Sequence, residues 1–201
     1  TSAQEVGLRL LTWLMVYQVF RNSPATTDLD RQALIKAVWQ HAVRIPSTLG
    51  YARSQNNNHL LSESLALIAA GQIFSKTSRR ARNWQKLGLQ QFNQGILDQI
   101  ETDGTYSQHS ANYQRMMLQL GLLYCGYAQD TLIEIPHQVK QRLAAATHWL
   151  IAQLDPVSGR LPNLGHNDGS LPLPMGCIEF RDYRPTAQAA SLAFLGNACL
   201  P

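Results

Sequence analysis

The sequence predicts an all-α fold, and three observations support this prediction. Apolar residues recur every three to four positions along nearly the whole chain, as on the buried face of a helix. The breaks between these segments carry Pro, Gly or Asp-Gly, which are typical of helix ends and turns. The segments are long and joined by short connections, a combination that favours antiparallel helix pairs.

Helix pairs of this kind can form a two-layer ring. We therefore expect an incomplete (α/α) toroid of antiparallel helix pairs that spans residues 1–201 as a single domain. A plain helical bundle or a solenoid is the alternative. No strict internal repeat is visible, which argues against a regular repeat solenoid.

The first helix is expected over residues 3–21. The second begins at a cap, Asp28 or Asp30, and ends or kinks at Pro46, because proline lacks the amide hydrogen that a helix needs. An Asp103-Gly104 pair predicts a turn between two later helices. The remaining helices are expected at about 58–75, 79–102, 108–128, 136–154 and 185–200.

Residues 155–184 interrupt the helical pattern with repeated Gly and Pro. An irregular segment of this length is uncommon inside a compact domain and is usually functional or disordered. We therefore predict a cleft loop at about 155–184.

Composition sets limits on the partners. The net charge is +4, from 17 basic and 13 acidic residues, which mildly favours an anionic partner. No run of Lys and Arg predicts a nucleic-acid-binding tail, and no run of 18 apolar residues predicts a membrane span. The cysteines form no CxxC pattern, and we expect neither a metal nor a cofactor. Arg9 stands on an otherwise apolar helix face and either extends to solvent or binds an anion in a groove.

A polar cluster opens the helix expected at 58–75. Asn57, Asn58 and His59 precede its apolar residues, and hydrogen-bond donors at a helix N-terminus can bind an anionic group. Glu63 lies four residues after His59, where it can fix one tautomer of the imidazole or raise its basicity. The alternative is a simple asparagine cap beside an ordinary histidine. A third metal ligand is not evident.

A second polar cluster opens the helix expected at 108–128. Tyr113 can transfer a proton if the pKa of its phenol is lowered. His109, four residues earlier on the expected helical face, would favour the phenolate, and Gln108 stands beside it. The alternative is a core aromatic residue with its hydroxyl at the rim.

The cleft loop carries the remaining candidates. His166 and Asp168, with Asn167 between them, can contact a sugar or a catalytic group, or can form an Asx-type turn. Tyr183 and Arg184 follow and are expected to line the same cleft.

Other catalytic classes have weaker support. The sequence has no Gly-rich phosphate loop, nucleophile elbow or HExxH motif. A glycoside hydrolase on a helical ring would need paired carboxylates, for which Asp103, Asp168 and Glu179 are the candidates. No local context distinguishes any of them.

Taken together, these residues resemble the heparinase II/III-like polysaccharide lyases, which include related alginate lyases. The resemblance rests on Glu5-Val6-Gly7-Leu8-Arg9 with Trp13, Asn57-Asn58-His59-Leu60 with Glu63, Asp103-Gly104 with Ser110 and Tyr113, and Gly165-His166-Asn167-Asp168-Gly169 with Tyr183-Arg184-Pro185. The Asn-His and Ser-x-x-Tyr pair is its most specific part. Two positions depart from the family pattern: Gln108, where an acidic residue is common, and His166, where Asp often follows the Gly.

The resemblance implies a toroid followed by a C-terminal β-sandwich, with substrate bound between them. It implies β-elimination at a uronic acid of an acidic polysaccharide and a periplasmic or secreted location. Carried over here, Asn58 and His59 would neutralise the carboxylate, and Tyr113 would transfer the proton. No strand-rich region is visible, so we expect a fragment that lacks the β-sandwich and part of the active site. A non-catalytic carbohydrate-binding module and a protein-interaction solenoid remain alternatives.

Overall fold

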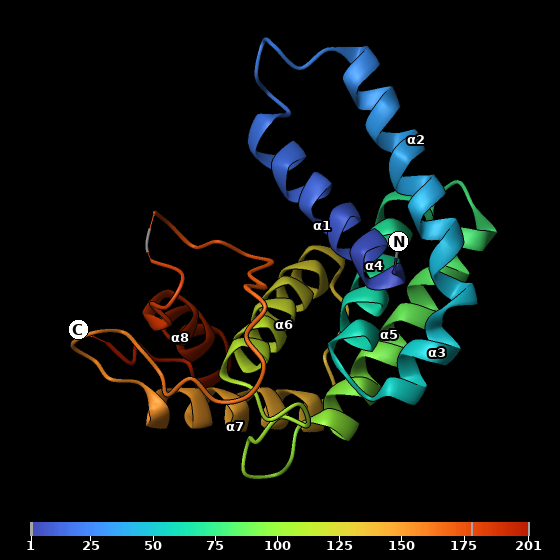
Figure 1. Cartoon of the computed structure of the whole chain (residues 1–201). Helices are drawn as coiled ribbons and strands as arrows, with labels where there is room; N and C mark the ends of the chain where they lie inside the picture. The colour runs from blue at the N-terminus through green and yellow to red at the C-terminus, as the bar shows by residue number, and fades with distance from the viewer. Residues whose placement is uncertain (1, 178, 201) are drawn as a thin grey trace. The chain divides into compact units, whose positions relative to one another are not determined.

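The structure is a computed structural model that describes residues 2–177 and 179–200 (Figure 1). Its helices are α1 (Ala3–Phe20), α2 (Asp28–Arg44), η1 (Ile45–Ser47), α3 (Leu49–Gln55), α4 (Asn58–Phe74), α5 (Arg79–Gln99), α6 (Ala111–Thr131), α7 (His137–Gln153), α8 (Arg184–Ala190) and the π-helical η2 (Ser191–Leu195). In the described residues the only β-type pairing outside helices is an isolated antiparallel bridge between Ile100 and Tyr106. The prediction of an all-α fold is confirmed.

The chain forms two compact units. Unit 1 comprises residues 1–55 and 59–92, and unit 2 comprises residues 56–58 and 93–201. The first residue of α4, Asn58, therefore belongs to unit 2, and α5 passes from unit 1 into unit 2 after Phe92. The toroid, the single domain and a C-terminal β-sandwich stay predictions.

Unit 1 is built from α1–α3, most of α4 and the first part of α5. The cap of α2 is Thr27, one residue before the expected position, and Asp30 completes a capping box with it. Small residues let the helices pack closely: a Cβ on Gly7 of α1 would lie 3.2 Å from Ser62 O of α4. A Cβ on Gly88 of α5 would lie 2.6 Å from Ser64 O of α4, so only glycine fits there.

The helix boundaries correct the sequence-based expectation in three places. After Pro46 the chain turns through η1 and forms the short α3, which we did not predict. α6 begins at Ala111, three residues later than expected, because Ser110 caps it. The last helix continues only to Leu195, as η2, and ends at Gly196, which adopts a left-handed conformation with φ 78°.

In unit 2, α6 packs against α7 and α8. Most of its residues from Ala111 to Gly121 are buried. The Asp103-Gly104 turn is confirmed and lies against α7: Gly104 has φ 90°, and a Cβ there would lie 2.2 Å from Ala145 O. Gln114 of α6 joins turn and helix, because its Nε2 donates to Gly104 O and Ala146 O, each at 3.1 Å.

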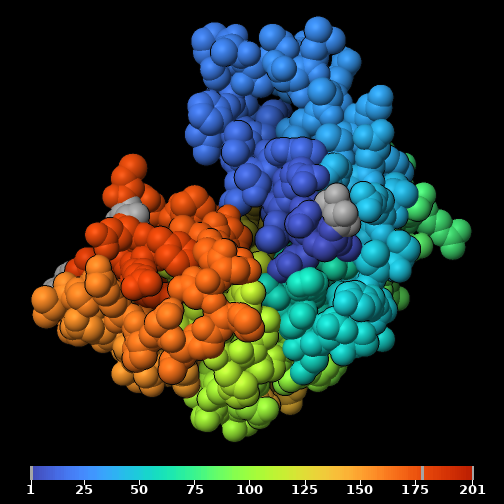
Figure 2. Space-filling view, viewed as in Figure 1, coloured from blue at the N-terminus to red at the C-terminus, as the bar shows by residue number. Residues whose placement is uncertain are grey.

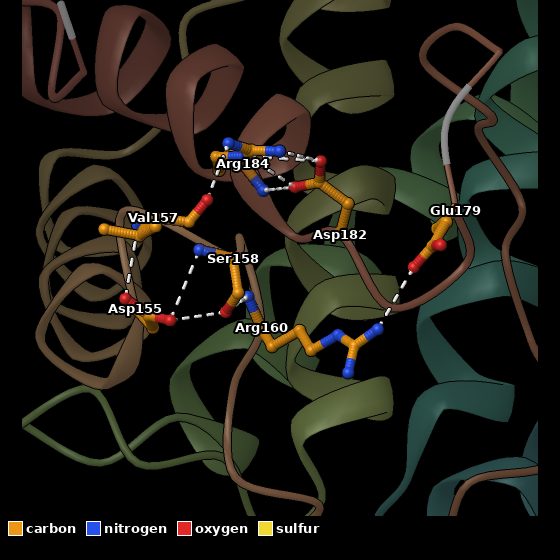
Figure 3. A network of polar contacts seen from close by, with 7 residues as sticks. All are labelled: Asp155, Val157, Ser158, Arg160, Glu179, Asp182 and Arg184. Atoms are coloured by element: carbon orange, nitrogen blue, oxygen red, sulfur yellow. Dashed lines mark hydrogen bonds and ion pairs between the residues drawn. The ribbon is translucent and has the colours of Figure 1, made fainter.

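The irregular loop between α7 and α8 is held by its own polar contacts (Figure 3). Asp155 accepts hydrogen bonds from Val157 N and Ser158 N, each at 3.2 Å, which closes a turn. Asp182 pairs with Arg184 at 2.7 Å. Most of the loop is exposed, and its atoms, orange in Figure 2, form a continuous part of the surface of unit 2.

None of the helices in the described ranges has both the length and the apolar character required to cross a membrane.

Candidate functional site

The N-terminus of α6 is the point where the loop meets the helix. Ser110 Oγ accepts a hydrogen bond from Tyr113 N at 3.1 Å, which caps α6, and donates to His166 O at 2.6 Å. Gly165 has φ 65°, and a Cβ there would lie 2.2 Å from His109 O, so the loop backbone approaches closely. One serine thus starts the helix and binds the loop.

A stripe of buried polar side chains on α6 continues this attachment. Asn112, Arg115 and Gln119 follow i, i+3, i+7 spacing and therefore share one face of the helix. Each is about 1% exposed. We call these three residues the α6 polar stripe.

The polar stripe binds the loop at separate points. Arg115 donates to Phe180 O and to Asn112 Oδ1, and its guanidinium lies between the rings of Phe180 and Tyr183, 4.3 and 4.4 Å from their centroids. Gln119 exchanges two hydrogen bonds with the backbone of Leu173, at 2.9 and 3.1 Å. The loop is exposed to solvent on one side and held by buried polar contacts on the other.

Tyr113 and Asp168 meet at the loop end of α6. The phenol of Tyr113 donates to Asp168 Oδ2 at 3.0 Å, and Asp168 Oδ1 accepts from Asn112 Nδ2 at 3.3 Å and from Ser170 N at 3.0 Å. Burial and the neighbouring Asp168 carboxylate both raise the pKa of Tyr113 above its ordinary value. Burial of Asp168 opposes its ionisation, but the hydrogen bonds from Ser170 and Tyr113 outweigh it and lower the pKa of the carboxyl.

Asn58 is brought to the same helix. Its backbone N donates to Gln108 Oε1 at 3.0 Å, and its side-chain Nδ2 donates to Met116 Sδ at 3.1 Å. Met116 lies three residues after Tyr113, on the neighbouring part of α6. Asn58 is 3% exposed. Two clusters separated by some fifty residues in the sequence therefore converge on the first two turns of α6.

Three predicted site residues belong to unit 1. Burial lowers the pKa of His59, which keeps its imidazole neutral. Glu63 is 2% exposed and accepts a hydrogen bond from Thr48 Oγ1 at 2.9 Å. Burial raises the pKa of Glu63 despite that bond, and its expected effect on the tautomer or basicity of His59 stays a prediction. Arg9 is exposed on α1.

A comparison with protein-family models identifies the family of the chain. The sequence model described as Heparinase II/III N-terminus matches residues 2–170, most of the chain. The chain belongs to the heparinase II/III family. No curated protein and no solved structure matches it in the corresponding comparisons.

Within this heparinase II/III-type chain, the position of His109 corrects one expectation. We placed His109 on the same helical face as Tyr113, four residues before it. The structure places it outside α6, exposed and with φ 47°, because the helix starts at Ala111. Gln108, which departs from the family pattern, accepts a hydrogen bond from Asn58 N through its side-chain Oε1. Asn57 is partly exposed in the short segment before α4.

The other loop candidates make hydrogen bonds or packing contacts that shape the loop. Asn167 and Asp168 each accept from the backbone two residues on, Gly169 N at 3.3 Å and Ser170 N at 3.0 Å, so the Asx-type turn predicted as an alternative is present. His166 contributes its carbonyl to Ser110. Tyr183 is buried against Arg115, and Arg184 pairs with Asp182, so both serve the packing of the loop.

The carboxylates considered for a hydrolase have structural partners. A hydrogen bond from Thr105 N lowers the pKa of Asp103, and Asp168 is bound to Tyr113. Glu179 pairs with Arg160 at 3.3 Å. A glycosidase acid needs a raised pKa, which neither Asp103 nor Asp168 has. Across the described residues, no group of three His, Cys, Asp or Glu side chains is arranged to hold a metal ion.

Sequence reasoning missed Asn112 and Arg115. Their signal was present, because a polar stripe at i, i+3, i+7 spacing runs through a helix whose other residues are mostly apolar. Polar residues in phase along a buried helix need partners, and a long irregular segment later in the chain can provide them.

Proposed function

We propose that this chain is the helical part of a polysaccharide lyase that cleaves an acidic, uronic-acid-containing polysaccharide by β-elimination. A base removes the proton at C5 of the uronic acid, the C4–O glycosidic bond breaks, and a C4=C5 double bond forms. The leaving oxygen takes up a proton. The observation that carries this proposal is the convergence of Asn58 and Tyr113 on the first two turns of α6.

Asn58 supplies the donor for the substrate carboxylate. Removing the C5 proton places negative charge on the adjacent carboxylate, and a preoriented donor stabilises that charge in the transition state. The side-chain amide of Asn58 donates to the thioether of Met116, which is a weak acceptor. A carboxylate oxygen is a stronger acceptor for an amide donor than this sulfur is.

His59 contributes as a neutral donor. Burial lowers the pKa of this residue, so its imidazole is uncharged near neutral pH and carries one N–H. A neutral imidazole next to Asn58 stabilises the developing charge by hydrogen bonding and not by ion pairing.

Tyr113 transfers the proton. Its side chain is partly exposed, and the atom that reacts, the phenol oxygen, lies at the surface shared by α6 and the loop. The second proton-transfer group would come from a C-terminal β-sandwich, which the family resemblance implies. The net charge of +4 favours attraction of a polyanionic substrate.

Product chemistry tests this proposal. The protein at its full natural length is incubated with a panel of uronic-acid polysaccharides and with neutral glycans as controls. We expect ultraviolet absorbance from an unsaturated uronate with at least one acidic substrate, none with neutral glycans, and its loss in Asn58→Ala. Saturated products would indicate hydrolysis, and binding without turnover would indicate a carbohydrate-binding module; either result contradicts the proposal.

A further inference from the structure

The hydrogen bonds behind Tyr113 have only one consistent direction. Arg115 carries donors and no acceptor, so the oxygen of the Asn112 amide must face it, and this contact is 2.7 Å. The NH₂ group of Asn112 therefore points the other way, to Asp168 Oδ1. Arg115 thus fixes the orientation of Asn112, and Asn112 presents a donor to Asp168.

The same reasoning continues to the phenol. Asp168 Oδ1 receives donors from Asn112 and from Ser170 N, while Oδ2 receives Tyr113. A phenol can either donate or accept, so the contact at Oδ2 does not by itself place the proton, but a carboxyl is a far stronger acid than a phenol. The proton of the Tyr113–Asp168 contact therefore resides on Tyr113.

We propose that Asp168 is a positioning residue that holds Tyr113 as a protonated phenol, so that Tyr113 is the acid of the elimination and not its base. Arg115 supports this arrangement from within unit 2 through Asn112. The role of acid rests on the proposed lyase function, whereas the control of the phenol by Asp168 does not. In the reaction the phenol hydrogen leaves its bond to Asp168 Oδ2 and passes to the leaving glycosidic oxygen as the C4–O bond breaks, and a separate base takes the C5 proton.

Other charged groups of unit 2 near Tyr113 do not offset Asp168. Arg115 directs its guanidinium at Asn112 and at the backbone and rings of the loop. Tyr106 is fully buried. Its burial raises the pKa of its own phenol and so opposes its ionisation. His109 precedes the helix and is exposed. Both burial and the Asp168 charge raise the pKa of Tyr113, in agreement with the donor–acceptor argument.

A spectrophotometric titration tests the first part without substrate. The tyrosinate absorbance of the unmodified protein and of Tyr113→Phe is measured as a function of pH. The difference between the two curves is the titration of Tyr113 alone among the seven tyrosines. The same pair is measured in an Asp168→Asn background. We expect Tyr113 to ionise at lower pH in Asp168→Asn, because the nearby negative charge is gone. An unchanged or higher ionisation pH would overturn the proposal.

Two variants control this measurement. Glu179→Gln removes one negative charge from the same loop, but its partner is Arg160, so it should leave the titration of Tyr113 unchanged. Asp168→Glu restores the charge and should move the pKa of Tyr113 back toward that of the unmodified protein. Circular dichroism of each variant checks that the helices are intact. A shift in Glu179→Gln equal to that in Asp168→Asn would mean a general charge effect and would refute the specific role.

The pH dependence of kcat/KM tests the second part. If Tyr113 is the acid, loss of its proton sets the alkaline limb, and Asp168→Asn moves that limb to lower pH. If Tyr113 is the base, the same variant moves the acidic limb and raises activity near neutral pH. If the titration shifts but no polysaccharide gives an unsaturated product, the lyase function fails and the control of Tyr113 by Asp168 stands.

Discussion

The N-termini of α4 and α6 look alike in sequence and differ in structure. Each start lies in a polar run that contains amides and a histidine; the first cluster was expected to bind an anionic group and the second to carry the proton-transfer residue Tyr113. α6 carries its own cap, Ser110, three residues before Tyr113. The first amide of α4, Asn58 N, is satisfied from outside, by a side chain fifty positions away, Gln108. The start of α6 thus has a local contact within the helix, and the start of α4 has a tertiary contact from a distant residue; only the local contact is readable from neighbouring residues.

The carboxylates of the two clusters differ in the same way. Glu63 lies in a buried position on α4, where burial raises the pKa of its carboxyl. Asp168 reaches α6 from the loop, where hydrogen bonds from Ser170 and Tyr113 overcome the effect of burial and lower the pKa. Burial favours the neutral form of Glu63, and hydrogen bonds favour the charged form of Asp168, so the two sites differ in their electrostatics. The predictions below test this contrast.

Tyr113→Phe should have the largest effect. We expect kcat to fall by about 10²–10⁴-fold, the usual contribution of general acid–base catalysis, because the variant keeps the ring and loses the proton. The unfolding free energy should change little, since the hydroxyl is at the surface. Steady-state rates of unsaturated product formation in the full-length protein measure this. Undiminished turnover would remove Tyr113 from the reaction.

Ser110→Ala tests the local helix start. The hydroxyl caps α6 and also binds His166 O, so we expect the unfolding free energy to fall by about 1–2 kcal/mol. Ser2→Ala is the matched control, because Ser2 caps α1 through Glu5 N at 3.3 Å and is exposed. The decrease in unfolding free energy should be smaller in Ser2→Ala than in Ser110→Ala. Urea denaturation compares the two, and equal losses would show that the bond to the loop adds nothing.

Gln108→Leu tests the tertiary helix start. Removing the oxygen that accepts from Asn58 N leaves that amide without this acceptor, at a cost of about 1 kcal/mol. Gln108→Glu keeps an acceptor, and its negative charge suits a helix N-terminus, so it should retain stability. Urea denaturation of both variants is the measurement. Equal destabilisation by Leu and Glu would contradict the capping role.

Glu63→Gln should have the smallest effect, visible in the pH dependence of stability. Thr48 Oγ1 lies 2.8 Å from Ile45 O and 2.9 Å from Glu63 Oε2. The hydrogen bond that Thr48 donates to Glu63 favours the charged carboxylate, but burial outweighs it. Burial raises the pKa of Glu63 above its ordinary value of 4.5. The folded state therefore binds the proton more tightly, and its stabilising effect, full below pH 4.5, is lost as pH rises through the folded pKa.

The side chain of Glu63→Gln cannot ionise. The pH dependence of the unfolding free energy that Glu63 causes should therefore be absent in this variant. Urea denaturation over a series of pH values, compared with the unmodified protein, measures it. A slope that is the same in both proteins would show that Glu63 titrates normally.

The sequence was informative about the elements and less so about the residues that support the site. Helical spacing located α1, α2, α4, α5, α6 and α7, because the buried face of a helix repeats every three to four residues. The short α3 was missed, since a helix of 7 residues soon after a proline has too few apolar repeats to be recognised. His109 was misplaced because one residue, Ser110, decides where α6 begins.

By itself, the sequence determined the all-α class, the irregular loop, the family and the presence of the two helices that carry Asn58 and Tyr113. These follow from spacing, capping and local motifs, which act over a few residues. Only the tertiary structure decided that Gln108 binds Asn58, that Asp168 binds Tyr113, and that Asn112 and Arg115 hold the loop. The physical reason is that buried polar groups must find partners wherever the fold brings them, and these partners lie some fifty or more residues away along the chain.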